Sequence, residues 1–121
     1  MEDKDFIIEN GVLIAYNGTK ESVIIPDGIT AIGEIAFEWN ETLKEAILPQ
    51  SLREIGFFAF RGCKNLTAIH IPRNVTVINK TAFFGTALKT ITIEDGNSAY
   101  TIADGYLIDT RTNERIYQLT A

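Results

Sequence analysis

Few residues of this chain are of the types that carry out chemistry, and they stand apart in the sequence. His70 is the single histidine and Cys63 the single cysteine, whereas nucleophilic catalysis needs a nucleophile beside a base and a closed zinc site needs four ligands. We expect His70 to be a solvated strand residue, with a pH-sensitive or ligand contact as the alternative. Cys63 is expected to be a structural thiol.

Acidic side chains occur in two close pairs, Glu38 with Glu41 and Glu94 with Asp95. Neither pair has a neighbouring base in the sequence, so we expect solvated surface groups and no acid-base pair. No glycine-rich segment runs into Gly-Lys-Ser or Gly-Lys-Thr, so a phosphate-binding loop is not expected either. The sequence thus predicts a protein that is not an enzyme and that uses no metal and no cofactor.

Five Asn-x-Thr triplets have the pattern of glycan acceptors. Asparagine favours turns and threonine favours strands, so a turn-rich β protein produces such triplets without any glycan, and we favour this second interpretation. The triplets begin at Asn17, Asn40, Asn65, Asn74 and Asn79.

Composition limits the class of protein. The 121 residues are 45% hydrophobic and 22% charged, which is the balance of one ordinary globular domain. The net charge of −5 repels phosphate backbones, so nucleic acid is not an expected partner. The start, Met1 to Asp5, is polar, and no apolar run reaches the length of a signal-peptide core or a membrane span. As given, the chain is expected to stay cytoplasmic, unless it is a segment of a longer exported protein.

The elements that position these residues follow an internal repeat of 23 residues. Pro26, Pro49 and Pro72 are separated by this step, and hydrophobic residues around each proline keep the same register. The third turn is one residue shorter before Leu88, which we interpret as a deletion in a loop. The hydrophobic columns are Ile25, Leu48 and Ile71; Ile29, Leu52 and Val75; Ile32, Ile55 and Ile78; Ala36, Ala59 and Ala82; Phe37, Phe60 and Phe83; and Leu43, Leu66 and Leu88.

Each repeat predicts one short strand ahead of its proline, in which alternate side chains point inward. Neighbouring strands then form a parallel sheet, and the Ala-Phe pair after each proline is expected to form a short helical turn that packs its ring inside. One turn cannot bury its own apolar face, so the ends need caps. The expected inward side chains are Val23, Ile25, Ala46, Leu48, Ile69, Ile71, Ile91 and Ile93.

Two similar segments near the ends of the chain predict these caps. Asn10-Gly11 and Asp104-Gly105 each lie between apolar residues, which is the strongest short-range signal for a β-hairpin. A further strand is expected at 115–119. The sequence therefore predicts one domain over residues 1–121, with an N-terminal hairpin cap over 1–20, three repeats and a fourth strand over 21–94, and a C-terminal hairpin cap over 95–121.

The string Leu-x-x-Ile-x-Ile-Pro-x-x-Val-x-x-Ile-x-x-x-Ala-Phe, from Leu66 to Phe83, resembles the BspA-type leucine-rich repeat. The resemblance covers nearly the whole chain, although the shortened third turn departs from the pattern near Thr86 and Ala87. Members of that family are similar in having Cys, Asn or Thr three residues after the Phe and in closing a block with Asn-x-x-Tyr-x-x-x-Asp-Gly-x-Leu. The matching positions here are Asn40, Cys63 and Thr86, then Asn97, Tyr100, Asp104, Gly105 and Leu107.

The resemblance implies an α/β leucine-rich-repeat solenoid that is rich in short parallel strands, has short helical turns on its convex side and carries a hairpin at each end. It also implies bacterial or protist proteins, often large and displayed at the cell surface, that contact host or partner proteins. The expected function is non-catalytic protein binding, as an adhesion or scaffolding module. The alternative is a structural spacer or a weakly self-associating unit without a dedicated ligand.

Two faces are candidate binding surfaces. The outward residues of the predicted sheet make a concave face, where Ile24 and Ile47 are apolar neighbours, and we expect the protein partner there. The competitor is a convex patch of residues that the repeat does not require to be inside, since aromatic side chains are frequent at interface hot spots. The concave face comprises Ser22, Ile24, Glu45, Ile47, Ala68, His70, Thr90 and Thr92, and the convex patch comprises Ile35, Trp39, Phe57, Phe58 and Phe84.

Overall fold

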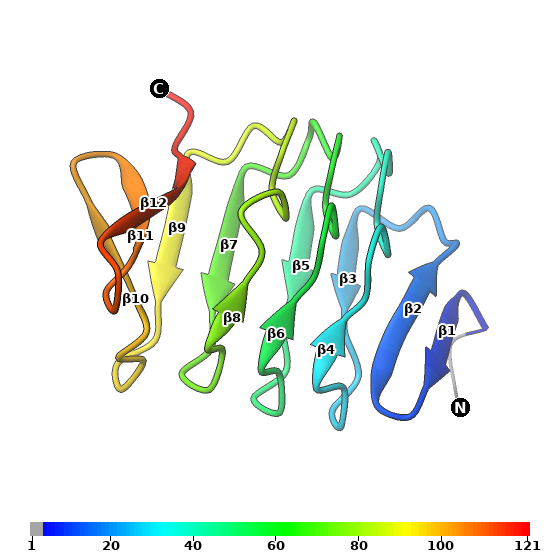
Figure 1. The fold of residues 1–121 in the computed structure, drawn as a ribbon. Coiled ribbons are helices and arrows are strands. Elements are labelled where there is room, and N and C mark those ends of the chain that lie inside the picture. The colour runs from blue at the N-terminus through cyan, green and yellow to red at the C-terminus, as the bar shows by residue number, and fades with distance from the viewer. Residues whose placement is uncertain (1–3) are drawn as a thin grey trace.

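The chain winds into successive turns that lie side by side along one axis, with the N- and C-terminal parts at opposite ends (Figure 1). The structure, a computed structural model, describes residues 4–121. Residues 1–3, which the expected N-terminal cap includes, lie outside the described residues. The turns contribute strands to two layers, and the hydrophobic core lies between the layers.

The first layer holds the strands that the repeat predicts ahead of each proline. β3 (Ser22–Ile24) pairs in parallel with β5 (Glu45–Ile47), and β7 (Ala68–Ile71) pairs in parallel with β9 (Thr90–Ile93). The expected inward side chains are buried, except that Ile93 is only partly buried. The layer is not one continuous ladder, because β5 and β7 are not hydrogen-bonded neighbours.

The second layer is a five-stranded sheet, and three of its strands are not expected from the sequence. β1 (Phe6–Glu9) and β2 (Val12–Tyr16) form an antiparallel hairpin, and β4 (Ala31–Ile32), β6 (Glu54–Ile55) and β8 (Val77–Ile78) follow in parallel. A strand of two residues is too short for an alternating pattern to be visible in the sequence. The inward residue of each of these short strands continues one of the predicted hydrophobic columns.

The expected helical turns on the convex side are not present, since residues 4–121 contain no helix. After β4 and β6 the amide N–H groups alternate between two kinds of acceptor. One N–H closes a tight turn, as Glu38 does on the carbonyl of Ile35 at 3.0 Å, and the next bonds to the neighbouring turn of the solenoid. An α-helix would need every N–H to bond four residues back in its own segment, so this alternation excludes it. The donors to the neighbouring turn are Ile35, Phe37 and Trp39, and their acceptors are the carbonyls of Phe57, Ala59 and Arg61.

Both ends of the solenoid carry antiparallel strands. At the C-terminal end, β10 (Tyr100–Ala103), β11 (Tyr106–Asp109) and β12 (Glu114–Gln118) form a three-stranded sheet. The Asn-Gly and Asp-Gly pairs are the turns of the two hairpins, and all four of these residues have positive φ, between 51° and 80°. This is the geometry of a type I′ turn, which explains the residue types.

An aromatic column runs through the core from one end to the other. Successive ring centroids lie 5.0 to 5.9 Å apart. The repeats supply its middle, and the terminal strands supply its ends. Its members, in order, are Phe6, Tyr16, Phe37, Phe60, Phe83 and Tyr117.

Candidate functional site

The concave face carries the outward residues that the alternation predicts, and all eight are exposed. Ile24 is 69% and Ile47 45% exposed, and they are direct partners in the β3–β5 ladder. Beside them, Ser22 Oγ donates a hydrogen bond of 2.7 Å to Glu45 Oε1. The face therefore offers a small apolar pair next to one carboxylate.

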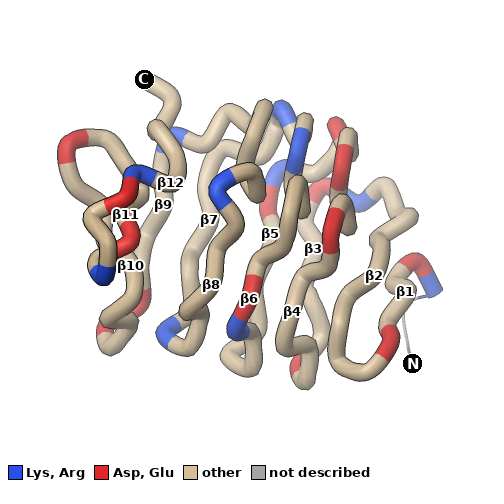
Figure 2. The backbone as a smooth tube through the Cα atoms, viewed as in Figure 1, with Lys and Arg blue, Asp and Glu red and all other residues tan. Residues whose placement is uncertain are grey.

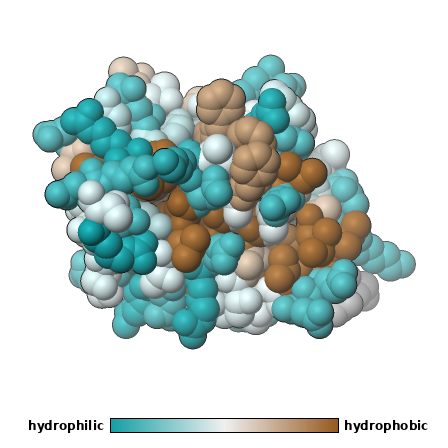
Figure 3. All heavy atoms as spheres, viewed as in Figure 1, coloured by the Kyte–Doolittle hydropathy of each residue, from teal (hydrophilic) through white to brown (hydrophobic). Residues whose placement is uncertain are grey.

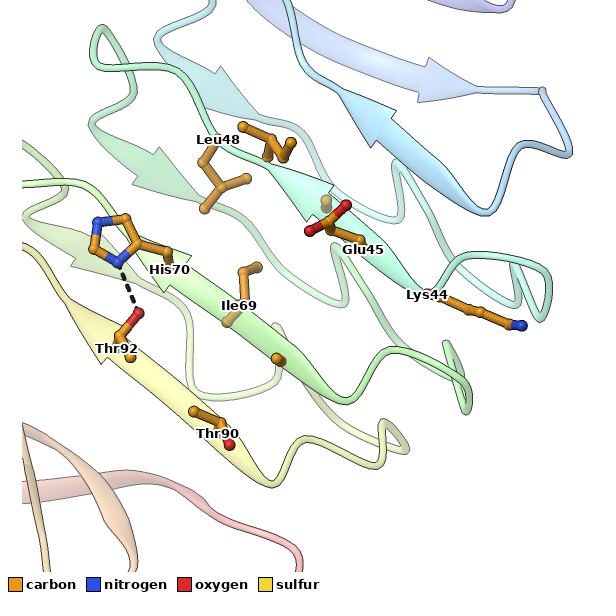
Figure 4. A pocket seen from close by; sticks show the side chains of 10 residues that line it. Lys44, Glu45, Leu48, Ile69, His70, Thr90 and Thr92 are labelled. Atoms are coloured by element: carbon orange, nitrogen blue, oxygen red, sulfur yellow. Dashed lines mark hydrogen bonds between the residues drawn. The ribbon is translucent and has the colours of Figure 1, made fainter.

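A depression of about 320 Å³ lies between β5 and β7, where the ladder is interrupted (Figure 4). Its walls include Glu45, His70 and Thr92, and the inward side chains of Leu48 and Ile69 also line it. His70 and Thr92 point toward one another, with 2.7 Å between Nδ1 and Oγ1. His70 is thus an exposed strand residue that bonds to its neighbour on the next strand.

The convex side brings the five residues of the predicted convex patch to one face. Figure 3 shows hydrophobic side chains gathered over this side of the molecule. The Phe57 and Phe58 rings lie 4.1 Å apart between centroids, and Phe84 lies 6.2 Å from Phe58. Trp39 is 58% and Phe84 61% exposed. We call Ile35, Trp39, Phe57, Phe58 and Phe84 the aromatic ridge.

Arg61 is held between two rings of the aromatic ridge. Its guanidinium carbon is 5.0 Å from the Trp39 ring centroid and 4.3 Å from that of Phe58, distances at which a cation is attracted to an aromatic face. Arg61 Nη1 also lies 3.3 Å from Glu38 Oε2. Behind the indole there is no space for a side chain at position 62, because a Cβ on Gly62 would lie 2.2 Å from Trp39 Cε3. The Trp39 ring therefore packs directly against the Gly62 backbone.

Three bulky residues of the aromatic ridge adopt the left-handed backbone region that favours glycine. The φ angles of Ile35, Trp39 and Phe58 are 55°, 62° and 52°. At the position of Trp39, the next two turns place Gly62 and Gly85, with φ of 73° and 79°. The same backbone conformation is thus formed twice by glycine and once by an exposed tryptophan.

A groove of about 890 Å³ adjoins the aromatic ridge on the outer side of the five-stranded sheet. Gly33 and Gly56 lie in it, and a Cβ at either would come within 2.9 Å of a carbonyl of the preceding turn. We call this the sheet groove. Its lining is Val12, Ile14, Ala15, Ala31, Ile32, Gly33, Glu34, Ile35, Glu54, Ile55, Gly56, Phe57, Val77 and Asn79.

Several carboxylates outside the sheet groove lie against basic residues, and residues of both signs are interspersed along the backbone in Figure 2. Of the predicted acidic pairs, Glu38 lies against Arg61 and Glu41 lies 3.5 Å from Lys64. Glu94 accepts hydrogen bonds from the Arg73 backbone N–H at 2.8 Å and from Gln50 at 3.1 Å. These bonds hold the pKa of Glu94 below its usual value. Glu38, Glu41 and Glu94 are therefore electrostatic contacts between turns of the repeat.

Cys63 is buried, and its Sγ donates a hydrogen bond of 3.1 Å to the carbonyl of Phe37. Burial raises the pKa of the thiol to about 12, although a hydrogen bond from the Asn40 backbone lowers it in part. The thiol therefore stays protonated at neutral pH and occupies the loop position at which Asn40 stands one turn earlier. Within residues 4–121, no group of three or more His, Cys, Asp or Glu is arranged to hold a metal ion.

Several asparagines of the Asn-x-Thr triplets use their amides inside the structure. Asn40 donates to the carbonyl of Gly18 at 3.3 Å, Asn74 donates to that of Gln50 at 3.3 Å, and Asn65 bonds to that of Glu41. The Asn40 side-chain oxygen also accepts from the backbone N–H groups of Thr42 and Leu43. These bonds join successive turns and loops, so the asparagines at these positions have a structural role.

The pattern of the BspA type leucine rich repeat region matches residues 14–110, in six copies. The chain belongs to this family. The match spans all three turns, part of the N-terminal hairpin and the whole of the β10–β11 hairpin, so the family and the solenoid geometry agree. No helix of the described residues has the length and apolar character needed to cross a bilayer.

Two solved leucine-rich-repeat structures are similar to this family member. One is a leucine rich cell surface protein from Faecalibacterium prausnitzii A2-165, with a TM-score of 0.67 and 36% identity over 74% of this chain. The other is a Leucine Rich Repeat protein from T. pallidum, with a TM-score of 0.59 and 26% identity over 73% of this chain. The matched parts are 23% and 48% of those proteins. No curated protein matches the chain.

Proposed function

We propose that the chain is a non-catalytic protein-binding module that works as an adhesion or scaffolding unit of a bacterial surface protein, with the aromatic ridge as its contact surface. The main support is the left-handed backbone of Ile35, Trp39 and Phe58, of which Ile35 and Trp39 are exposed. Outside glycine this conformation costs about 1 to 2 kcal/mol per residue. Such strain is found at functional sites, where the surrounding structure holds it in place.

Folding alone does not require a tryptophan at position 39. Gly62 and Gly85 form the same turn as Trp39 without a side chain and without strain. The tryptophan instead places a large ring on the surface, packed against Gly62 and beside Arg61. Trp, Arg and neighbouring Phe rings are the side chains that supply most of the binding energy in protein interfaces.

The surface context is part of the proposal. The similar protein from Faecalibacterium prausnitzii is described as a leucine rich cell surface protein, and it is much longer than the matched segment. Repeat solenoids commonly use extended faces for binding, because successive turns place equivalent side chains in rows. We therefore place this chain in a surface protein in which it presents one such row.

The experiment compares the two candidate faces. Biotinylated protein is used to capture surface proteins of host or neighbouring cells, and each captured protein is followed with two double variants. The aromatic ridge is supported if the Ile24→Asp, Ile47→Asp variant still captures the partner and the Trp39→Ala, Phe84→Ala variant no longer does. The reverse result would assign binding to the concave face, and capture unchanged in both variants would contradict the proposal for both surfaces.

A structural spacer or self-associating unit is the second candidate. The exposed ridge favours it, because apolar rings on two copies are able to cover each other. Light scattering over a range of concentrations tests it. A molar mass that stays at the monomer value of 13.5 kDa at high concentration removes self-association through the ridge.

A further inference from the structure

We infer that the sheet groove takes a partner segment that carries apolar side chains together with a Lys or Arg. This deepens the proposed function and rests on it, since it names the chemistry of the segment that would bind beside the aromatic ridge. The inference comes from the shape of the groove, from its apolar walls and from two carboxylates that have no partner.

Two glycines line the groove just after its short strands. Gly33 follows β4 and Gly56 follows β6, one turn apart, and each packs so closely on the preceding turn that a side chain would meet a carbonyl. Ile14 and Phe57 also line the groove, and each side chain is 42% exposed. The groove thus crosses the strands along the solenoid axis, between apolar walls.

The length of the groove suits a short extended segment. Its lining comes from β2, β4, β6 and β8, and four neighbouring strands span about 14 Å at a spacing of about 4.8 Å. An extended chain rises about 3.3 Å per residue, so about four residues cover this span. Side chains of such a segment would alternate between the groove and solvent.

The charge of the groove has one sign. Glu34 and Glu54 are the charged residues of its lining, and the lining contains no Lys, Arg or His. In the part of the chain that the structure describes, no ion pair or hydrogen bond reaches either carboxylate. The glutamates Glu38, Glu41 and Glu94, by contrast, each face a basic residue.

This contrast follows from the register of the repeat. Glu38 and Glu41 have basic residues one step of 23 later, at Arg61 and Lys64, whereas the residue one step after Glu34 is Phe57 and that after Glu54 is Val77. The repeat therefore supplies a counter-charge to Glu38 and Glu41, whereas Glu34 and Glu54 in the groove have apolar neighbours at the equivalent positions. The missing counter-charge is what a partner would bring.

A purely apolar or acidic occupant does not fit the carboxylates of Glu34 and Glu54. Covering the groove with such a segment would take two carboxylates away from water without giving them a counter-charge, which disfavours binding. A Lys or Arg avoids this cost, because its hydrocarbon stem lies along the apolar wall while its charged end meets the carboxylate. A second copy of this chain is a poor occupant, since each copy carries a net charge of −5.

The test uses ¹⁵N-labelled protein and two acetylated and amidated six-residue peptides, one of alternating Leu and Lys and one of alternating Leu and Glu. We expect the Leu-Lys peptide to shift the amide signals of Gly33 and Gly56 and the Leu-Glu peptide to leave them unchanged. Equal binding of both peptides, or shifts that fall on the concave strands β5 and β7, would overturn the inference.

Matched variants separate a specific site from general attraction to an acidic protein. Glu34→Gln with Glu54→Gln should weaken Leu-Lys binding at least five-fold. The control is Glu21→Gln with Glu45→Gln, which changes the net charge equally but away from the sheet groove. This control should change the affinity for the Leu-Lys peptide less than two-fold. Equal losses in both pairs would show attraction by net charge only and refute the site. A well-dispersed spectrum for each variant establishes that it is folded.

Failure of the inference and failure of the proposed function give different results. If the Trp39→Ala with Phe84→Ala variant loses its captured partner while the peptides show no preference, the inference is wrong and the proposed function stands. If Leu-Lys binds in the sheet groove and the ridge variants lose nothing, the ridge assignment is wrong and the groove chemistry stands.

Discussion

The rings of Phe37 and Phe60 lie nearly parallel, with their centroids 5.0 Å apart and an angle of 8° between their planes. They are 23 residues apart in sequence and equivalent in successive turns. Phe83 continues the stack, at 5.8 Å and 20° from Phe60. The step of the sequence repeat is thus the step between adjacent layers of the core.

Removing the ring of Phe60, in the middle of the stack, should destabilise the fold. Phe60 is fully buried between rings on both sides, so Phe60→Ala is expected to lower the free energy of unfolding by about 3 to 5 kcal/mol. Urea denaturation followed by circular dichroism measures this. Phe84→Ala, at an exposed ring, serves as the control and should cost much less. Similar losses in the two variants would contradict the stacked core.

Backbone strain at Trp39 predicts an unusual order of stability. Trp39→Gly relieves the left-handed conformation, whereas Trp39→Ala keeps it and also removes the ring. The glycine variant should therefore be more stable than the alanine variant by about 1 kcal/mol. The comparison is made by denaturant titration of both proteins. At Thr42, an exposed residue with no positive φ, the same pair of substitutions should not favour glycine.

The buried thiol predicts a loss of stability at alkaline pH. Unfolded Cys63 ionises near pH 9.0, whereas the folded thiol has its pKa raised to about 12 by burial. The contribution of the protonated thiol to the free energy of unfolding is complete below pH 9. It falls by up to about 1.4 kcal/mol per pH unit as the pH rises from about 9 toward 12. Denaturation at several pH values checks the slope. In Cys63→Ala this part of the slope should disappear, and an unchanged slope would show that other groups cause it.

The hydroxyl of Tyr100 completes the edge of β8. It accepts a hydrogen bond of 2.7 Å from the Ile78 backbone N–H, and Arg111 donates to the carbonyl of Thr76 beside it at 2.7 Å. Tyr100→Phe leaves a buried N–H without an acceptor and should cost about 1 to 3 kcal/mol. Hydrogen exchange at Ile78 should speed up accordingly. Tyr106→Phe is the matched control, and equal effects would contradict this role.

The C-terminal strands are proposed to cap the core. Tyr117 of β12 packs its ring edge on Phe83 and shares a hydrogen bond of 2.9 Å with Thr86, at the shortened loop. Tyr117→Ala should therefore expose Phe83 and destabilise the third turn before the first. Site-resolved hydrogen exchange that rises near Leu88 and not near Leu43 is the expected pattern. Uniform loss of protection along the chain would argue against a local cap.

The repeat in the sequence was enough to predict the core. The columns at Phe37, Leu43 and Ile55 recur because each lies in an environment that repeats with the turns, and all of them are buried as expected. The strands ahead of the prolines followed from the alternation of inward and outward side chains. The type I′ hairpin turns followed from Asn-Gly and Asp-Gly.

The convex side could not be predicted in the same way. A Gly-x-x-Ala-Phe segment is compatible with a helical turn in isolation, and what excludes the helix is hydrogen bonding to the next turn, a contact 22 residues away. The positive φ of Trp39 was equally hidden, although Gly62 and Gly85 in the same column were a usable signal. The sheet groove arises from two-residue strands, which leave no pattern in the sequence.

Hydrogen bonds between successive turns have a mechanical consequence. Each turn is held chiefly by its neighbours, so a force applied along the solenoid axis would separate turns one after another and would not open the whole domain at once. Every released turn of 23 residues would lengthen the chain by about 75 Å at roughly 3.3 Å per residue. A chain built in this way yields to tension in equal increments while the remaining turns keep their shape.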